Sequence, residues 1–276
     1  MGNRGVVRIG VFIPTECQLL DVACVDIFGT ISHEYMTLCA GLIPQAVIDL
    51  APSVRISYIS GGPAPSPTTA AASAAAIVKE PMASDHTAAS NRVIPLTSGM
   101  SILSTCHYTE AAVAPGKLDI VLVPGPDPNT TFEAGAIEWL RRQGDVETTD
   151  ILSICTGILL CGEAGLLKGR TACGPRGLQD KIRDRFGHDV ILKGTELRWA
   201  QDGRFWSSGG VTNGNDLVAA YARQSKHFPR PVVEVALAMT DTGDRAQKYS
   251  QGQTSFVLGM IRNILGAVFL GFWRKK

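Results

Sequence analysis

The sequence lacks several features that mark nucleic-acid-binding and metal-binding proteins. Charged residues fill only 18% of the 276 positions, and 26 basic against 25 acidic side chains leave a net charge of +1. A nucleic-acid-binding surface normally needs a basic stripe, so we expect no nucleic-acid partner. The seven cysteines form no C-x-x-C pair, which argues against a zinc knuckle or a thioredoxin-like site. No other spacing in the sequence predicts a metal ligand set.

The first ten residues also lack the apolar run and the small-residue cleavage site of a secretory signal. An odd number of cysteines without a repeated spacing does not indicate a disulfide framework. Both observations favour a reducing compartment, in which most thiols stay free. We therefore expect a cytoplasmic protein.

Short apolar, β-branched runs alternate with helical patterns along most of the chain. The runs predict buried strands at residues 6–13, 54–60, 118–124, 150–155 and 204–207. The intervening patterns predict helices at residues 18–32, 132–143, 156–165, 178–186 and 216–224. This alternation is typical of an α/β fold with a doubly wound, mostly parallel sheet sandwiched by helices.

Two segments depart from the alternation. Between residues 61 and 90, 23 of 30 positions hold Ala, Ser, Thr, Pro or Gly, which predicts a flexible insert with little apolar area to bury; whether it acts as a lid stays open. Residues 255–273 carry one charge, Arg262, and precede Arg274-Lys275-Lys276. We expect one domain over residues 1–230 and a helical extension over 231–276. The extension packs on the body or across a dimer interface, and a weak membrane contact is the alternative.

The pentapeptide Ser153-Ile154-Cys155-Thr156-Gly157 lies where a predicted buried strand turns directly into a helix. This pattern is typical of a nucleophile elbow, which exposes its middle side chain at the carboxyl end of the sheet. The N–H groups and the dipole of the helix N-terminus favour the thiolate. We interpret Cys155 as a candidate nucleophile, and a buried structural cysteine is the alternative.

Two carboxyl groups, Glu16 and Asp21, follow the first predicted strand. Loops at the carboxyl ends of neighbouring parallel strands meet where ligands bind. Either carboxyl group is therefore placed to hold the thiol or to relay a proton. A helix N-cap explains Asp21 equally well.

The stretch 153–172 resembles the signature of the ThiJ/PfpI superfamily, which is class I glutamine amidotransferase-like, and 9–28 and 208–217 are similar in register and order. Within that superfamily, Gln18-Leu19-Leu20-Asp21 most resembles the isocyanide-hydratase branch. The resemblance implies a flavodoxin-like sandwich, usually dimeric, without a cofactor. It also implies that Cys155 is the nucleophile and Asp21 the acid/base, with Glu16 as an alternative acid. Thr156 and Gly125 would then bind the substrate or an oxyanion through backbone N–H groups.

The sequence departs from the family pattern in three places. Pro175 stands where many relatives have a histidine, so the usual Cys–His pair is missing there. Pro124-Gly125-Pro126 replaces Pro-Gly-Gly, and Pro126 offers no N–H, which counts against peptide or ester hydrolysis. Cys173 lies near Cys155 in the family register, and we expect it to pack rather than to react.

These patterns lead to two alternative functions. The first is a cofactor-free, cysteine-dependent enzyme that acts on a small organic molecule. It would be of the hydratase or lyase type, either isocyanide-hydratase-like or a tailoring step of specialised metabolism. The second is a non-catalytic redox-sensing or chaperone-like protein that uses the same cysteine.

Overall fold

The computed structural model describes residues 5–61, 92–187 and 189–273. Apart from Gly61, the predicted flexible insert lies outside the described residues, as do the three terminal basic residues.

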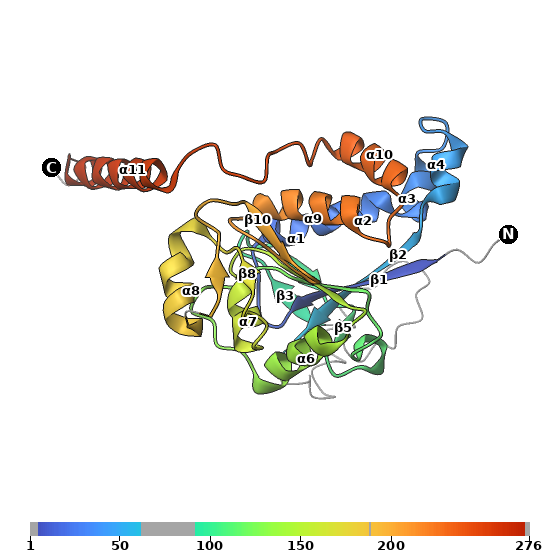
Figure 1. Ribbon diagram of the computed structural model, residues 1–276, viewed down its shortest axis with the longest axis horizontal. Helices are drawn as coiled ribbons and strands as arrows, with labels where there is room; N and C mark the ends of the chain where they lie inside the picture. Colours follow the sequence, from blue (N-terminus) through green and yellow to red (C-terminus); the bar gives the residue numbers. More distant parts are fainter. Residues whose placement is uncertain (1–4, 62–91, 188, 274–276) are drawn as a thin grey trace.

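A seven-stranded sheet forms the centre of the protein, in the order β10-β11-β7-β6-β1-β2-β5 (Figure 1). Every neighbouring pair in it is parallel except β10 with β11. Its strands are β1 (Val6–Ile13), β2 (Ser53–Ser60), β5 (Cys106–His107), β6 (Ile120–Val123), β7 (Asp150–Ser153), β10 (Trp199–Asp202) and β11 (Phe205–Ser208). The predicted α/β class with a mostly parallel, flavodoxin-like sheet is confirmed.

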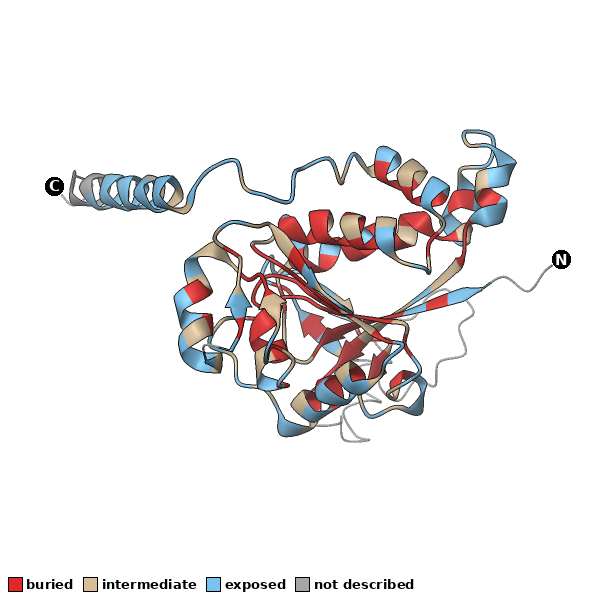
Figure 2. Cartoon of the chain, in the orientation of Figure 1, coloured by how far each residue is buried: buried red, intermediate tan, exposed pale blue. Residues whose placement is uncertain are grey.

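Helices cover both faces of this sheet. One layer contains α1 (Leu19–Ala23), α2 (Val25–Ile31), α3 (His33–Leu38), α4 (Gln45–Leu50), α9 (Asn213–Gln224) and α10 (Arg230–Thr240). The other contains α6 (Ala134–Asp145), α7 (Gly157–Glu163) and α8 (Gln179–Phe186). Two hydrophobic clusters fill the spaces between sheet and helices, and they appear as the red interior of Figure 2. Alternation along β1 sends Ile9, Val11 and Ile13 into the first cluster and Phe12 into the second.

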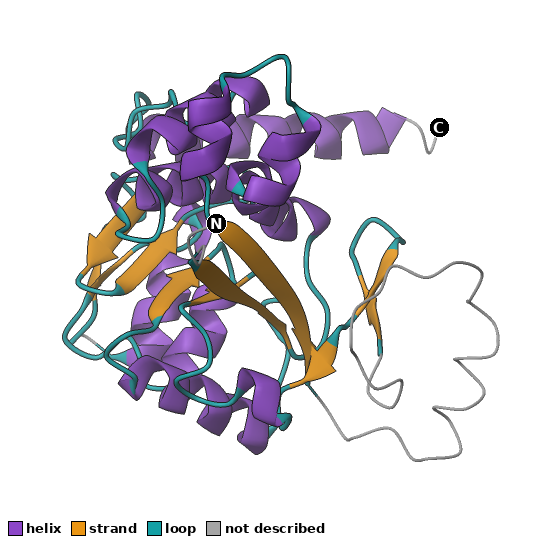
Figure 3. Cartoon of the chain, turned by 90° about the vertical axis from the view of Figure 1, so that its right-hand side faces the viewer, coloured by secondary structure: helices purple, strands orange, loops and turns teal. Residues whose placement is uncertain are grey.

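Two small ladders lie outside the main sheet. The hairpin of β3 (Val93–Pro95) and β4 (Ser101–Leu103) stands apart from the main sheet in Figure 3. Its loop is tied to the segment after β1, because the Thr97 amide donates to the Cys17 carbonyl at 3.2 Å. The second ladder pairs β8 (Thr171–Ala172) with β9 (Ile191–Leu192).

The predicted helix over residues 18–32 is interrupted at Cys24, which separates α1 from α2. The Cys24 thiol donates to the Asp21 carbonyl at 3.1 Å, and the Ile27 amide bonds back to the Cys24 carbonyl three residues earlier. These bonds tighten the turn and start a second helix. The break leaves Asp21 in the first turn of a five-residue helix.

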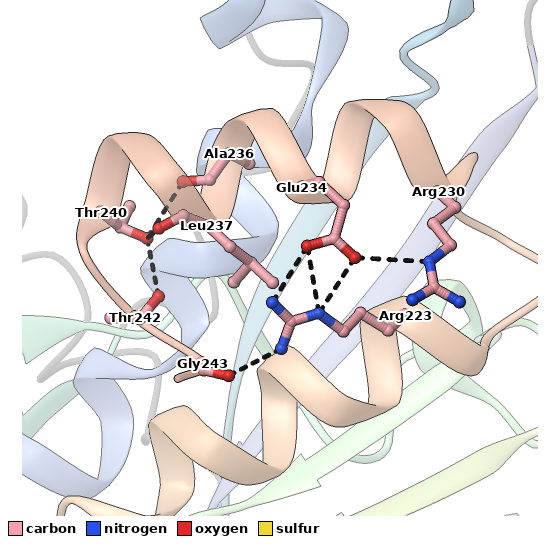
Figure 4. A network of polar contacts seen from close by, with 8 residues as sticks. All are labelled: Arg223, Arg230, Glu234, Ala236, Leu237, Thr240, Thr242 and Gly243. Atoms are coloured by element: carbon pink, nitrogen blue, oxygen red, sulfur yellow. Dashed lines mark hydrogen bonds and ion pairs between the residues drawn. The ribbon is translucent and has the colours of Figure 1, made fainter. Parts of the chain in front are cut away.

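An ion-pair network fastens α10 to α9 (Figure 4). The Arg223 guanidinium of α9 donates to both carboxylate oxygens of Glu234 at 3.0–3.2 Å, and to the Gly243 carbonyl at 2.7 Å. Arg230 lies 3.4 Å from the same carboxylate. The apolar face of α10, formed by Val232, Val233, Ala236 and Leu237, is buried in the first core cluster.

The last helix, α11 (Gln253–Trp273), extends beyond the α/β body (Figures 1 and 2). Arg176 holds its start, since this guanidinium donates to Gln253 Oε1 at 3.1 Å and lies 4.4 Å from the Phe256 ring centroid. From Val257 to Val268 almost every residue is exposed. α11 falls within the predicted helical extension, and among the described residues nothing buries this part of it. No helix in the described ranges is long and apolar enough to cross a bilayer.

Candidate active site

The candidate site lies where the crossovers of the chain change direction within the sheet. β1 pairs in parallel with β2 on one side and β6 on the other, and β6 continues to β7. Ligands bind at the carboxyl ends of strands at such a switch point. Asp21 follows β1, Gly125 follows β6, and Cys155 follows β7. The sheet order therefore brings three residues that are distant in sequence to one edge.

Cys155 lies at a strained turn between β7 and α7. Its φ of 55° is in the left-handed region, which only one other described non-glycine residue, Asp241, occupies. The turn is fixed from both sides: the Ile154 amide donates to the Val123 carbonyl, and the Gly157 amide to the Ile154 carbonyl, both at 2.9 Å. A Cβ at Gly157 would lie 2.2 Å from the Val123 oxygen. This is the backbone geometry that the nucleophile-elbow pattern predicts.

Asp21 is fully buried beside this thiol. Its Oδ2 accepts a hydrogen bond from the Gly125 amide at 3.1 Å. Its Oδ1 is buried without a partner of ordinary hydrogen-bond geometry among the described residues, although the Cys155 thiol is close enough to lower the pKa of the carboxyl group as a donor. The carboxyl group thus has Oδ2 anchored to the backbone and lies close to the thiol.

Gly125 is needed because three groups converge on its Cα. A Cβ there would lie 2.5 Å from Asp21 Oδ2 and 2.4 Å from Thr156 Oγ1. The Gly125 amide, which the sequence suggested as an oxyanion donor, points to Asp21 in this structure. The Thr156 hydroxyl donates to the Pro126 carbonyl at 2.6 Å, and its backbone N–H lowers the pKa of Cys155.

Burial is the largest influence on the pKa values of Asp21 and Cys155. Burial raises the pKa of Asp21 to about 7, against the opposing hydrogen bonds from Gly125 and Cys155. Burial and the charge of Asp21 raise the pKa of the Cys155 thiol to about 12. We expected the helix N-terminus to favour the thiolate, but burial and the neighbouring carboxylate outweigh it. The resting site is therefore a neutral thiol beside a carboxyl group that titrates near neutrality.

Glu16 takes a different position from Asp21. Its Oε1 accepts from the Asp127 amide at 3.2 Å and from the Thr130 hydroxyl at 2.8 Å. It thereby holds the loop that follows β6. On the outer side of the same loop, Lys181 Nζ donates to Asn129 Oδ1 at 3.2 Å.

A cleft of about 600 Å³ opens beside the elbow. Its walls are formed by Glu16, Gln18, Thr97, Pro126, Asp127, Pro128, Asn129, Thr130 and Thr156. The volume is in the range of pockets that take small organic ligands. The sequence analysis missed the contribution of Thr97, although the hairpin was signalled by Val93-Ile94-Pro95 and Ser101-Ile102-Leu103 around a Ser-Gly turn.

Of the remaining cysteines, Cys24 is next to Asp21, since its thiol donates to the Asp21 carbonyl, and burial and the charge of Asp21 raise the pKa of Cys17 and of Cys24. All seven cysteines are free. Cys173 is buried and its thiol is directed to the Leu197 carbonyl at 3.6 Å, which agrees with a packing role. His33 Nδ1 bonds the Ile48 carbonyl and His107 Nδ1 bonds Thr109. In the described part of the chain no group of three or more His, Cys, Asp or Glu side chains could hold a metal.

The sequence matches one family model and one curated protein of known activity. The model of the DJ-1/PfpI family matches residues 60–224. Isonitrile hydratase from Pseudomonas putida is 28% identical over 137 residues, which are 48% of this chain and 55% of that protein. The match therefore spans about half the length of this curated relative.

Solved structures share the fold. A ThiJ/PfpI family protein from Pseudomonas syringae superposes with a TM-score of 0.60 at 17% identity, over 95% of this chain and 88% of the other. Schizosaccharomyces pombe DJ-1 gives a TM-score of 0.53 at 12% identity, over 84% of this chain and 98% of the other.

Proposed function

The chain belongs to the DJ-1/PfpI family, and from that premise we propose that it is a cofactor-free hydratase of small organic isonitriles. Cys155 is the nucleophile and Asp21 the proton carrier. The observation that carries the proposal is the elbow thiol beside a buried carboxyl group whose pKa lies at about 7. The partial similarity to isonitrile hydratase suggests the substrate class.

In the first step of the proposed reaction, the thiol adds across the terminal carbon of R–N≡C. The Cys155 sulfur bonds to that carbon as its proton passes to Asp21, and Asp21 delivers the proton to the same carbon, which gives the thioimidate R–N=CH–S. The raised thiol pKa suits this coupled step, because the sulfur becomes nucleophilic only as Asp21 takes the proton. Carboxylate Oδ1 is the acceptor that the geometry leaves available.

Water completes the proposed cycle. It adds to the thioimidate carbon, the nitrogen gains a proton, and the sulfur leaves with a proton returned through Asp21. The product is the formamide R–NH–CHO, so the sum is R–N≡C plus one water. No electrons are exchanged and no cofactor is needed for this balance.

The alternative of a redox sensor has less physical support. Sensor cysteines are solvent-accessible and have a low pKa, whereas Cys155 is 6% exposed and burial raises its pKa. Two other expectations from the sequence remain proposals: a homodimer and a cytoplasmic location.

Turnover of a small neutral alkyl isonitrile tests the proposal. The loss of the N≡C infrared band and the appearance of the formyl proton in NMR spectra should occur together with the native chain. Cys155→Ser should abolish both, and Asp21→Asn should slow them by about 100-fold or more. Cys39→Ser, which changes a half-buried cysteine in the turn after α3, is the matched control.

Glu16→Gln separates the two candidate acids. With Asp21 as the proton carrier, this variant should retain turnover to within about tenfold, because Glu16 shapes the loop rather than contacting the thiol. Formamide production by Cys155→Ser, or its absence with the native chain, would refute the proposed function.

A further inference from the structure

The described part of α11 has two dissimilar faces. Successive residues of an α-helix are rotated by about 100°, so Val257, Ile261, Ile264 and Val268, spaced four, three and four apart, form one line. Leu258, Met260 and Leu265 flank that line. All seven side chains are 41–66% exposed. The opposite face holds Ser255, Gly259, Arg262, Asn263 and Gly266.

Within residues 5–61, 92–187 and 189–273, nothing covers this apolar face. The contacts between the described body and the helix lie at its start, where Arg176 contacts Gln253 and Phe256. A contiguous apolar surface of this length on an exposed helix marks an interaction site with a partner protein or a membrane.

The charged residues near α11 favour a membrane over a partner protein at this face. After Tyr249 the sequence contains four basic residues, Arg262, Arg274, Lys275 and Lys276, and no acidic one. A second copy of the helix would offer these cations no acidic partner, and the positions beside the apolar line hold Leu and Met instead of the charged pairs that specify helix association. Anionic lipid headgroups do complement basic residues next to an apolar helix.

We propose that α11 docks on a bilayer surface that contains anionic phospholipid. The face of Val257, Ile261, Ile264 and Val268 enters the boundary between headgroups and acyl chains. Arg262 contacts the headgroups, and Arg274, Lys275 and Lys276 add to the positive charge of this part of the sequence. The Arg176 contacts at the start of α11 join the body to the docked helix.

Vesicle flotation of the full-length protein tests this proposal. Vesicles of phosphatidylcholine with about 30 mol % phosphatidylserine should carry the protein upward, and vesicles of phosphatidylcholine alone should bind it at least about tenfold more weakly. Ile264→Glu and Asn263→Glu add the same charge on opposite faces. Ile264→Glu should bind at least about tenfold more weakly than Asn263→Glu, because only the former loses apolar insertion.

Several results would overturn the inference. They are no flotation with the anionic vesicles, equal binding to both vesicle types, or equal loss in the two variants. A vesicle-free oligomer that Ile264→Glu dissociates, without vesicle binding, would assign the face to a second copy. Thermal unfolding of both variants checks that the body is intact, and none of these results depends on isonitrile turnover.

Discussion

The Cys155 thiol and the Asp21 carboxyl group determine where the proton of the candidate site resides. Both are buried, and the charge of Asp21 raises the pKa of the thiol, whereas the hydrogen bond from the thiol lowers the pKa of the carboxyl group. The backbone favours ionisation of Asp21 over ionisation of the thiol, because Asp21 Oδ2 accepts a hydrogen bond from the Gly125 amide. The proton therefore rests on sulfur, and the carboxylate is the base that must remove it.

The raised pKa of Asp21 has a consequence for stability. Burial raises its pKa from 3.8 in the unfolded chain to about 7 in the folded protein, so the folded state holds the proton more tightly. Between these values the folded protein binds more protons than the unfolded one, and stability falls as pH rises. Above about pH 7 this contribution is constant.

Asp21→Asn should remove this penalty. The free energy of unfolding of the variant, relative to the native chain, should rise between about pH 5 and about pH 8 by on the order of 1 to 3 kcal/mol. Urea unfolding at the two pH values measures the difference. Glu147→Gln, which neutralises an exposed carboxylate, should show no such change. A pH-independent difference for Asp21→Asn would mean that Asp21 is ionised throughout this range.

At the scale of elements, the elbow depends on the close approach of α7 to the end of β6. The Cα of Gly157 lies where any Cβ would be 2.2 Å from the Val123 oxygen. Because that contact is with backbone, no rotation of a side chain relieves it.

Gly157→Ala should therefore destabilise the protein by about 2 kcal/mol or more and also reduce turnover by displacing the neighbouring thiol. Gly177→Ala is the matched control, since a Cβ there meets nothing within 4 Å, and it should change stability by less than about 0.5 kcal/mol. Chemical denaturation and the isonitrile assay measure the two effects. Equal stability of the two variants would show that the turn tolerates displacement.

The elements that could be predicted are those whose burial shows as an apolar pattern in the local sequence. β1 matches its prediction residue for residue, because its sequence is rich in β-branched residues and its last five positions, from Ile9 to Ile13, are all buried. Short or compositionally mixed elements such as α3 and α4 carry no comparable signal. β10 forms only by antiparallel pairing with β11, which is a tertiary contact.

The candidate site also has features that local sequence predicts and features that depend on packing. The strand-to-helix pattern located Cys155, and the order of motifs placed Asp21 near it. The pKa of the thiol was expected to fall and instead rises, since burial and the Asp21 charge depend on packing that local sequence does not contain. The direction of the Gly125 amide likewise depends on a carboxyl group 104 positions earlier in the sequence.

At the scale of the whole molecule, the segment between α10 and α11 returns to the body before the chain leaves it. Arg245 pairs with Asp216 at 2.6 Å, and Asp216 is 5% exposed. The backbone of Lys248 forms an antiparallel β-bridge with Leu197. The Tyr249 hydroxyl accepts a hydrogen bond from Asn213 Nδ2 at 2.7 Å. These contacts belong to the folded body, whereas α11 beyond Phe256 adds exposed surface.

This division predicts different outcomes for two truncations. A chain that ends at Gly252 loses the Gln253 and Phe256 contacts with Arg176 but keeps the returning segment, so its Tm should fall by no more than a few degrees and its turnover should persist. A chain that ends at Thr240 also loses the partner of the buried Asp216 carboxylate, and a larger fall in Tm is expected because an unpaired buried charge is costly. Circular dichroism melts and the isonitrile assay compare the two. If the chain that ends at Gly252 is destabilised as much as the chain that ends at Thr240, α11 is part of the folding unit. Its apolar face would then be needed for the stability of the chain itself.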